Sequence, residues 1–428
     1  MGTLRESATE IFRKTLEEMS PANLVKKAIQ VDAGHIKIQG KKLTHESRVP
    51  VYVIGAGKAV VQMAAGLESV LGNRIRDGVV IAPAGSESDL SIIQVFEGTH
   101  PVPDQQTVAS SLELMDFARS IPKDACVIFL ISGGASSLME VPAGQLELEE
   151  IREVYDTLLK SGATIQEMNT VRKQLSAIKG GKLAKLLKAG TSASLIISDV
   201  PGDNPDFIAS GPTTQSKSKK EDALKVLEKF GLTDKVPPAV VEFLSVHDLE
   251  SEEEPHTNHR NVIIGSSGMF AKEAGKLCKD MGFSTFVSSK QYTEEADKVA
   301  EHITKEIRKM KSGKRAYIFH GESTVHVKGD GKGGRNLHLA LLMSKKISRR
   351  KNTLLLSAGT DGVDGNTDVA GAFAASDTSK RAAELGMDAS DYLKDFNSYH
   401  FFKTLGDLIF TGPTGNNVMD FQLILIDA

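Results

Sequence analysis

The sequence predicts an α/β protein of two domains, with helices covering mainly parallel sheets. The chain has 428 residues, which is more than one hydrophobic core usually organises. Its 40% hydrophobic and 25% charged residues are typical of a globular protein. Short β-branched runs alternate with amphipathic helical patterns along the whole chain, as expected for sheets covered by helices.

The first half of the chain contains a regular series of strand candidates. They are the segments 49–54, 78–82, 92–96, 127–131 and 195–197. A helix is expected over 105–120, because Asp104 can cap its start and apolar residues recur on one face. We therefore expect residues 1–245 to form a doubly wound, three-layer domain of the Rossmann or flavodoxin kind.

The second half predicts another α/β domain, over residues 260–428. The charged segment 245–259 has no apolar period and is interpreted as a linker. Further strands are expected at 262–265, 284–288, 316–320, 324–328, 352–357 and 421–426. The short turn between 316–320 and 324–328 predicts an antiparallel hairpin, and hence a mixed sheet. The last strand or helix could also pack back on the first domain, and we expect the active site in the interdomain cleft.

Charge and cysteine content exclude several classes of protein. The 52 Lys and Arg residues against 55 Asp and Glu give a formal charge of −3, too little to hold nucleic acid or a membrane surface. Two cysteines supply neither a disulfide framework nor metal-type spacing. No stretch approaches the roughly 20 apolar residues that span a bilayer, and residues 3–18 do not resemble a signal peptide. We expect a cytoplasmic monomer or homodimer that binds a small molecule.

Two glycine loops follow predicted strands of the first domain and should expose backbone N–H groups to an anion. Residues 55–58 (Gly-Ala-Gly-Lys) match neither a complete dinucleotide fingerprint nor a Walker A loop, and a plain turn is an equally valid reading. Lys58 favours a site, because a cation in the first turn of a helix needs an anionic partner. Residues 132–137 (Ser-Gly-Gly-Ala-Ser-Ser) add hydroxyl donors and predict a phosphate cradle.

Other candidates in the first domain have equally simple structural readings. Arg172 and Lys179 lie in a cationic helical segment before a glycine pair, which could bind phosphate or form a solvated face. Asp199 follows a predicted strand and could bind a divalent cation or cap a turn. His100 lies on a proline-rich loop after a strand, where it could contact substrate or simply form part of a turn. The basic patch 217–220 is interpreted as an exposed turn.

Two loops of the second half are further candidates for a functional site. Segment 328–336 contains four glycines and ends in Arg335 and Asn336, which suits a loop that encloses an anion and meets its charge. Segment 357–368 carries Asp361 and Asp364 but lacks the glutamate of an EF-hand. We expect one of these aspartates near Mg²⁺ or near a substrate hydroxyl.

Taken together and in their order along the chain, these loops resemble those of the two-domain glycerate kinase family, whose C-terminal half is called the MOFRL domain. The resemblance spans nearly the whole chain, and its motifs are residues 55–58, 98–104, 132–138, 169–182, 198–203, 210–213, 333–336 and 357–368. The chain departs from the family pattern where Leu337 and His338 replace a usual Gln-Glu pair, and where Asn366 replaces a usual proline.

The resemblance implies ATP- and Mg²⁺-dependent phosphorylation of D-glycerate and favours 2-phosphoglycerate as the product. It places Lys58 and Arg335 at the positions of the family's catalytic lysine and arginine, and Asp199 is the candidate proton acceptor. The expected substrate contacts are Lys58, His100 and Arg172; the expected ATP contacts are Ser132, Gly133, Gly134, Ala135, Ser136, Ser137 and Lys179; the expected metal ligands are Asp199, Asp361 and Asp364.

Three alternatives stay open at this point. A kinase of the same family could instead form 3-phosphoglycerate. A non-catalytic sensor of sugar phosphates would also use glycine-serine loops, but it would need neither Arg335 nor the acidic loops. A nicotinamide-dependent hydroxy-acid oxidoreductase is disfavoured, because the fingerprint at residues 55–60 is incomplete.

Overall fold

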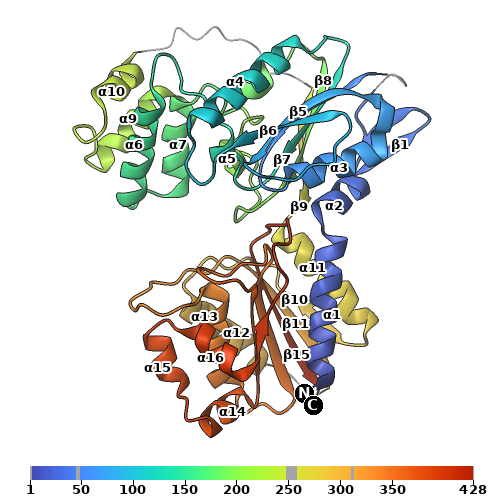
Figure 1. Ribbon diagram of the computed structural model, residues 1–428, viewed down its shortest axis with the longest axis vertical. Helices are drawn as coiled ribbons and strands as arrows, with labels where there is room; N and C mark the ends of the chain where they lie inside the picture. Colours follow the sequence, from blue (N-terminus) through green and yellow to red (C-terminus); the bar gives the residue numbers. More distant parts are fainter. Residues whose placement is uncertain (1, 45–48, 247–257, 310–312, 428) are drawn as a thin grey trace. The chain divides into compact units, whose positions relative to one another are not determined.

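Figure 1 shows the protein as a computed structural model, which describes residues 2–44, 49–246, 258–309 and 313–427. The chain divides into two compact units. The N-terminal unit comprises Pro21–Ser198 and Asp203–Ile264, and the C-terminal unit comprises residues 2–20, Asp199–Gly202 and Gly265 onward. This division differs from the predicted one at the first helix and at the strand near residue 262. Most of the predicted linker, 247–257, lies outside the described residues.

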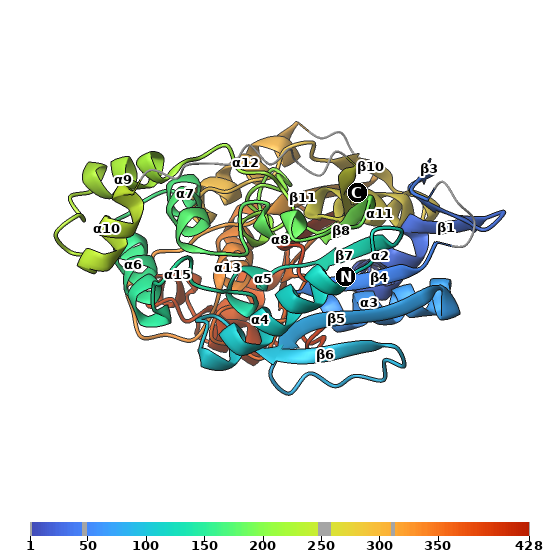
Figure 2. The same cartoon turned by 90° about the horizontal axis from the view of Figure 1, so that it is seen from above.

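The N-terminal unit is built on a six-stranded sheet with the order β6-β5-β4-β7-β8-β9. Its strands are β4 (Val51–Ala56), β5 (Ile75–Pro83), β6 (Ile93–Gly98), β7 (Cys126–Ile131), β8 (Thr191–Ile197) and β9 (His259–Gly265). Neighbouring pairs from β6 to β8 are parallel, and Figure 2 shows β6, β5, β4 and β7 following one another across the sheet. In chain order this is 3-2-1-4-5-6, so the predicted doubly wound fold is confirmed.

Helices of the N-terminal unit fall into two groups. α2 (Pro21–Ala28), α3 (Val60–Leu71) and α4 (Gln105–Ser120) lie near the sheet, and Asp104 caps α4 by accepting a hydrogen bond from the Thr107 amide at 2.9 Å, as predicted. α6 (Leu148–Lys160), α7 (Ile165–Leu175), α9 (Lys220–Lys229) and α10 (Pro238–Ser245) surround their own apolar cluster. Short elements connect them: η1 (Gly72–Arg74), α5 (Ala135–Leu138), α8 (Lys182–Lys185) and η2 (Ile208–Ser210). A small antiparallel sheet, β1 (Ile29–Asp32), β2 (His35–Ile38) and β3 (Lys41–Lys42), was not predicted.

The C-terminal unit contains a mixed six-stranded sheet, as predicted, with the order β10-β11-β15-β12-β13-β14. Its strands are β10 (Ser284–Val287), β11 (Lys314–Gly321), β12 (Thr353–Gly359), β13 (Gly371–Ala375), β14 (Leu408–Ile409) and β15 (Asp420–Asp427). β10 pairs with β11 in parallel, and the other neighbours are antiparallel.

The hairpin predicted from 316–320 and 324–328 is wrong. Residues 324–328 form no strand, and Thr324 makes only an isolated bridge to Glu295. β15 occupies the antiparallel place beside β11, with Asp420 opposite Gly321. β15 therefore lies inside the C-terminal sheet, between β11 and β12, and does not return to the first sheet.

Alternation along β15 separates two layers of helices. Phe421 stacks on Phe12 of α1 (Gly2–Glu18), with ring centres 5.8 Å apart, and α1 packs on α11 (Ser267–Asp280). Ile424 joins a cluster on the opposite face with α12 (Ala296–Arg308) and α13 (Arg335–Ile347), which α14 (Thr378–Glu384), α15 (Ala389–Lys394) and α16 (Ser398–Leu405) extend. Asp420 and Gln422 share the parity of Ile424 and therefore face α13. Among the described residues, no helix is long and apolar enough to cross a membrane.

Candidate functional site

The loops after β4 and β7 form the first candidate site, at the point where the strand order reverses. The Lys58 amide donates to the Gly133 carbonyl at 2.9 Å, and the Ser132 amide donates to the Ala56 carbonyl at 3.2 Å. The Ser132 hydroxyl accepts from the Ala59 amide at 3.1 Å. The structure thus joins the two predicted anion loops into one surface, where doubly wound proteins bind their ligands.

Glycine is required at two positions of this surface. Gly57 has φ 139°, and a Cβ there would lie 2.1 Å from the Ser132 hydroxyl. Gly134 has φ 82°, and a Cβ there would lie 3.1 Å from both the His100 ring and the Lys58 side chain. These contacts place Lys58 and His100 side by side over the second loop, although 42 residues separate them in the chain. Partial burial, together with the charge of Lys58, lowers the pKa of His100.

A hydrogen-bonded relay ties the second loop to helix α7. The Ser136 hydroxyl lies 2.9 Å from the Ser210 hydroxyl, which donates to the Asn169 side chain at 2.9 Å. Ala209 and Ser210 have φ values of 54° and 58°, an uncommon conformation for residues other than glycine. The relay holds the loop against α7 in one conformation.

Lys179, which the sequence predicted to contact ATP, lies inside the fold. Its side chain is fully buried, and its ammonium group pairs with Glu140, which also accepts a hydrogen bond from the Tyr155 hydroxyl at 3.0 Å. Burial lowers the pKa of Lys179, and Glu140 opposes this effect. Glu140 therefore compensates the charge of Lys179 inside the fold. Arg172 lies with its guanidinium carbon 5.0 Å from the centre of the Tyr155 ring, and its Nε is buried without a described hydrogen-bond partner.

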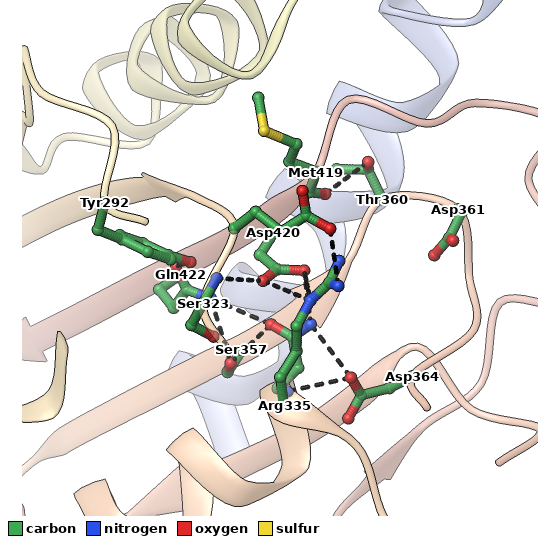
Figure 3. Close-up of polar contacts among 12 residues, drawn as sticks. Tyr292, Ser323, Arg335, Ser357, Thr360, Asp361, Asp364, Met419, Asp420 and Gln422 are labelled. Atoms are coloured by element: carbon green, nitrogen blue, oxygen red, sulfur yellow. Dashed lines mark hydrogen bonds and ion pairs between the residues drawn. The ribbon is translucent and has the colours of Figure 1, made fainter. Parts of the chain in front are cut away.

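The second candidate site surrounds Arg335, the first residue of α13 (Figure 3). The Arg335 Nε lies 3.0 and 2.9 Å from the two carboxylate oxygens of Asp420, and Nη1 lies 2.8 Å from Glu322. Asp420 is fully buried at the start of β15, whereas about a third of the Arg335 side chain is exposed. Burial raises the pKa of Asp420 to about 7, although the charge of Arg335 opposes the shift. A buried acid therefore fixes a partly exposed cation.

Asn336 is the centre of the polar network beneath Arg335. Its Nδ2 donates to Asp420 at 2.8 Å, and its Oδ1 accepts from the Ser357 hydroxyl and from Gln422, both at 3.1 Å. Gln422 accepts a hydrogen bond from the Tyr292 hydroxyl (Figure 3). Side chains from β12 and β15, together with Tyr292, thereby hold the start of α13.

Asp364, which the sequence predicted as a metal ligand, contacts the start of α13. Its two oxygens accept the backbone amides of Asn336 and Leu337 at 3.0 and 2.8 Å, so it caps the start of α13. Burial raises its pKa to about 6. Asp361 lies closer to solvent and accepts the Val363 amide at 3.2 Å, while Asp199 lies in the short segment Asp199–Gly202 of the C-terminal unit.

The carboxylates in the described part of the chain do not form a ready-made metal site. Within the described ranges, no group of three His, Cys, Asp or Glu side chains is placed to hold a metal ion. Asp364 uses both oxygens on α13, so it has little capacity left for a cation.

A cavity of about 600 Å³ opens beside Arg335. Asp361 and the backbone of the glycine loop at 331–334 line it, together with His338 and Phe396. The His338 ring stacks on Phe396, with ring centres 4.8 Å apart. Burial lowers the pKa of His338, which favours its neutral form.

Sequence reasoning missed the partners that hold Arg335. Glu322, Asp420 and Gln422 carry no motif of their own, and they follow or lie within apolar strand patterns. The useful signal was the alternation of residues 420–426, which places two polar side chains on the same face as buried isoleucines.

Comparisons with known proteins agree with this arrangement. A family described as a domain of unknown function (DUF4147) matches residues 7–245, and the MOFRL family matches residues 315–420. The D-glycerate 2-kinase of Thermotoga maritima is 38% identical over 433 residues, covering 99% of each chain. The chain belongs to the glycerate kinase family.

The same family relationship is visible in a second relative and in a solved structure. The glycerate 2-kinase of Pyrococcus horikoshii is 36% identical and covers 99% of this chain and 98% of its own. The crystal structure of glycerate kinase from Thermotoga maritima matches this fold with a TM-score of 0.87 at 37% identity, over the full length of both chains. The family resemblance predicted from the loops is confirmed. Members of this family are phosphotransferases.

Proposed function

We propose that this member of the glycerate kinase family transfers the γ-phosphoryl group of ATP to D-glycerate, giving 2-phosphoglycerate and ADP. One observation carries the proposal: the loop after β4, with Lys58, is hydrogen-bonded to the glycine-serine loop after β7. Together they present a cation, hydroxyls and closely packed glycines at the strand ends where doubly wound proteins bind phosphates. Relatives at 38% and 36% identity are named D-glycerate 2-kinase and glycerate 2-kinase.

In this proposal the glycine-serine loop, residues 132–137, binds the phosphates of ATP. Gly133 and Gly134 allow the close approach of phosphate oxygens to the backbone, and Ser136 and Ser137 supply hydroxyl donors. The relay from Ser136 through Ser210 to α7 limits movement of the loop, so its donors keep their positions during the reaction.

Lys58 and His100 bind the carboxylate of glycerate in the same proposal. Their side chains both lie against Gly134, and the low pKa of His100 makes it a neutral hydrogen-bond donor near neutral pH. Arg172 remains a proposed substrate contact.

Arg335 stabilises the negative charge of the transferring phosphoryl group. Its Nε and Nη1 are held by Asp420 and Glu322, whereas Nη2 has no hydrogen-bond partner among the described residues. A preorganised cation of this kind is suited to a loose transition state, in which charge lies on the phosphoryl oxygens. Asp199 is the proposed acceptor of the hydroxyl proton, a role that contributes less in such a transition state.

Magnesium would enter this scheme bound to the nucleotide, because Mg²⁺ commonly binds through phosphate oxygens and water with one or two carboxylates. Asp361 is the predicted metal ligand that lines the cavity beside Arg335. On this loop, we assign the metal contact to Asp361 and not to Asp364.

The test is product analysis by ³¹P and ¹³C NMR, with purified protein, ATP, Mg²⁺ and D-glycerate. We expect 2-phosphoglycerate. Formation of 3-phosphoglycerate would keep the kinase and overturn the regiochemistry. No product from D-glycerate, with no turnover of NADH or NADPH with hydroxypyruvate, would favour the sensor of sugar phosphates.

A further inference from the structure

The N-terminal unit contains a second cavity with unusual electrostatics. It has a volume of about 330 Å³ and lies beside the end of α7. The described side chains that line it include no carboxylate, although the chain as a whole carries a formal charge of −3. Its cationic lining consists of Lys173, Lys182, Lys185 and Lys220. We call this feature the lysine cavity.

The fold holds three of these lysines in place. The Lys173 side chain is almost completely buried, and its ammonium group pairs with Asp206 at 2.6 Å. Lys182 donates to the carbonyls of Lys173 and Ser176 at 2.8 and 2.5 Å. Buried lysines are rare in proteins, so the presence of two of them, Lys173 and Lys220, around one cavity requires an explanation.

Lys220 is the least expected of the four. The sequence predicted residues 217–220 as an exposed turn, but Lys220 begins α9 and is only 9% exposed. Its ammonium nitrogen lies 4.1 Å from the centre of the Phe243 ring, which also lines the cavity. The face of an aromatic ring attracts a cation, so this contact holds the Lys220 ammonium group at the cavity wall.

The uncharged lining also favours an acceptor-rich ligand. Ser216 and Ser218 lie 2.8 Å apart through their hydroxyls, and Gln174 donates to the Ser218 carbonyl at 2.7 Å. Ammonium groups donate hydrogen bonds and accept none, which matches the oxygens of a phosphate group. The volume is at the lower end of the range for small-molecule sites, about 300–1,000 Å³.

The lysine cavity is distinct in its lining from the loops after β4 and β7. Neither Lys58 nor any residue of 132–137 lines it. The Ser136–Ser210–Asn169 relay links the loop after β7 to α7, and Asn169 lies one helical turn before Lys173 on this helix. We propose that the lysine cavity is a second anion site, which binds a small molecule carrying two or more adjacent phosphate groups.

Lys185 and Lys188 provide a matched test. Both are exposed and three residues apart, but only Lys185 lines the cavity. Isothermal titration calorimetry of the full chain with inorganic pyrophosphate should show binding that Lys185→Glu weakens at least about tenfold, while Lys188→Glu stays within about twofold of the unmodified protein. Higher salt should weaken binding, since part of the site is exposed. Equal affinities for the two variants, or no binding at millimolar pyrophosphate, would overturn the proposal.

A third variant distinguishes this site from the proposed catalytic loops. Lys58→Ala should keep its affinity for pyrophosphate, because Lys58 does not line the cavity. Loss of binding in Lys58→Ala, with binding retained in Lys185→Glu, would place pyrophosphate on the catalytic loops and refute a second site. The readout is binding alone, so a failure of the kinase assay would leave this result interpretable.

Discussion

Arg335 and Asp420 lie 85 residues apart in the chain, yet the Nε of the arginine is within 3.0 Å of both carboxylate oxygens. The contact joins the first residue of α13 to the first residue of β15. Asp420 is buried and raised in pKa to about 7, so its charged form depends on Arg335 and on the amide of Asn336. The sheet therefore fixes the orientation of Arg335 through Asp420.

This relationship predicts a positioning role for Asp420. Asp420→Asn preserves shape but removes the charge that orients Arg335, so kcat should fall about tenfold or more with a smaller change in KM. Glu322→Gln is the control, because Glu322 is more exposed and should contribute less. Steady-state ADP release should be measured together with circular dichroism melting, and equal effects of the two substitutions would contradict the buried anchor.

Lys58 and Arg335 should each be required for turnover. Lys58→Ala and Arg335→Ala are expected to lower kcat by roughly a hundredfold or more, as for the loss of one donor to a transition state. Lys188→Ala, at an exposed position outside the two candidate sites, should retain nearly full activity. Near-normal turnover in either test variant would remove that residue from the mechanism.

Asp364 should support the fold without affecting the metal requirement. Asp364→Asn weakens the cap of α13, and we expect a loss of about 1–2 kcal/mol in the free energy of unfolding. The Mg²⁺ concentration for half-maximal activity should stay unchanged, whereas Asp361→Asn should raise it. A higher Mg²⁺ requirement in Asp364→Asn would restore Asp364 as a metal ligand.

His100 should show a depressed pKa that depends on Lys58. Burial and the lysine charge disfavour the imidazolium in the folded protein, so the unfolded chain takes up the proton first as the pH falls below about 6.5. The contribution of His100 to stability is therefore lost on acidification. An NMR titration, assigned with His100→Gln, should give a midpoint below 6.5 that rises in Lys58→Met; an unchanged midpoint would separate the two residues.

The buried pair of Lys179 and Glu140 should be structural. Glu140→Gln leaves an uncompensated ammonium group in the core and should cost about 3–5 kcal/mol in urea unfolding. The double variant Glu140→Gln/Lys179→Met should recover most of this loss, because it removes the buried charge. If Lys179→Met reduced ATP affinity while stability was unaffected, Lys179 would contact the nucleotide after all.

Local patterns predicted the elements whose residues have strong preferences. The buried runs of β4, β5 and β7 are rich in valine and isoleucine, and Asp104 is a recognisable cap. β13 escaped notice because its sequence, Gly-Ala-Phe-Ala-Ala, has little β propensity outside a sheet. The glycine loops, by contrast, could be predicted, because close backbone approaches require glycine.

Long-range pairing explains what the sequence could not predict. Residues 324–328 have a strand-like composition, but β15 competes for the same edge of β11 and supplies eight paired positions. In the sequence Lys179 resembles a surface cation, because its buried partner Glu140 lies 39 residues earlier and only the fold brings the two together. Asp364 reads as a metal ligand because its hydrogen-bond partners on α13 precede it by nearly thirty residues.

The central place of β15 constrains how the chain is assembled during synthesis. α1 packs on β15 and α11, so residues 2–18 must wait for partners that leave the ribosome after the whole N-terminal unit has been made. Until residues 420–427 emerge, β11 and β12 have no strand between them, and α1 lacks its contact with β15, including the stack of Phe12 on Phe421. The N-terminal unit, whose sheet is complete by residue 265, can fold well before this point. α1 is therefore made before this unit but is among the last elements to dock.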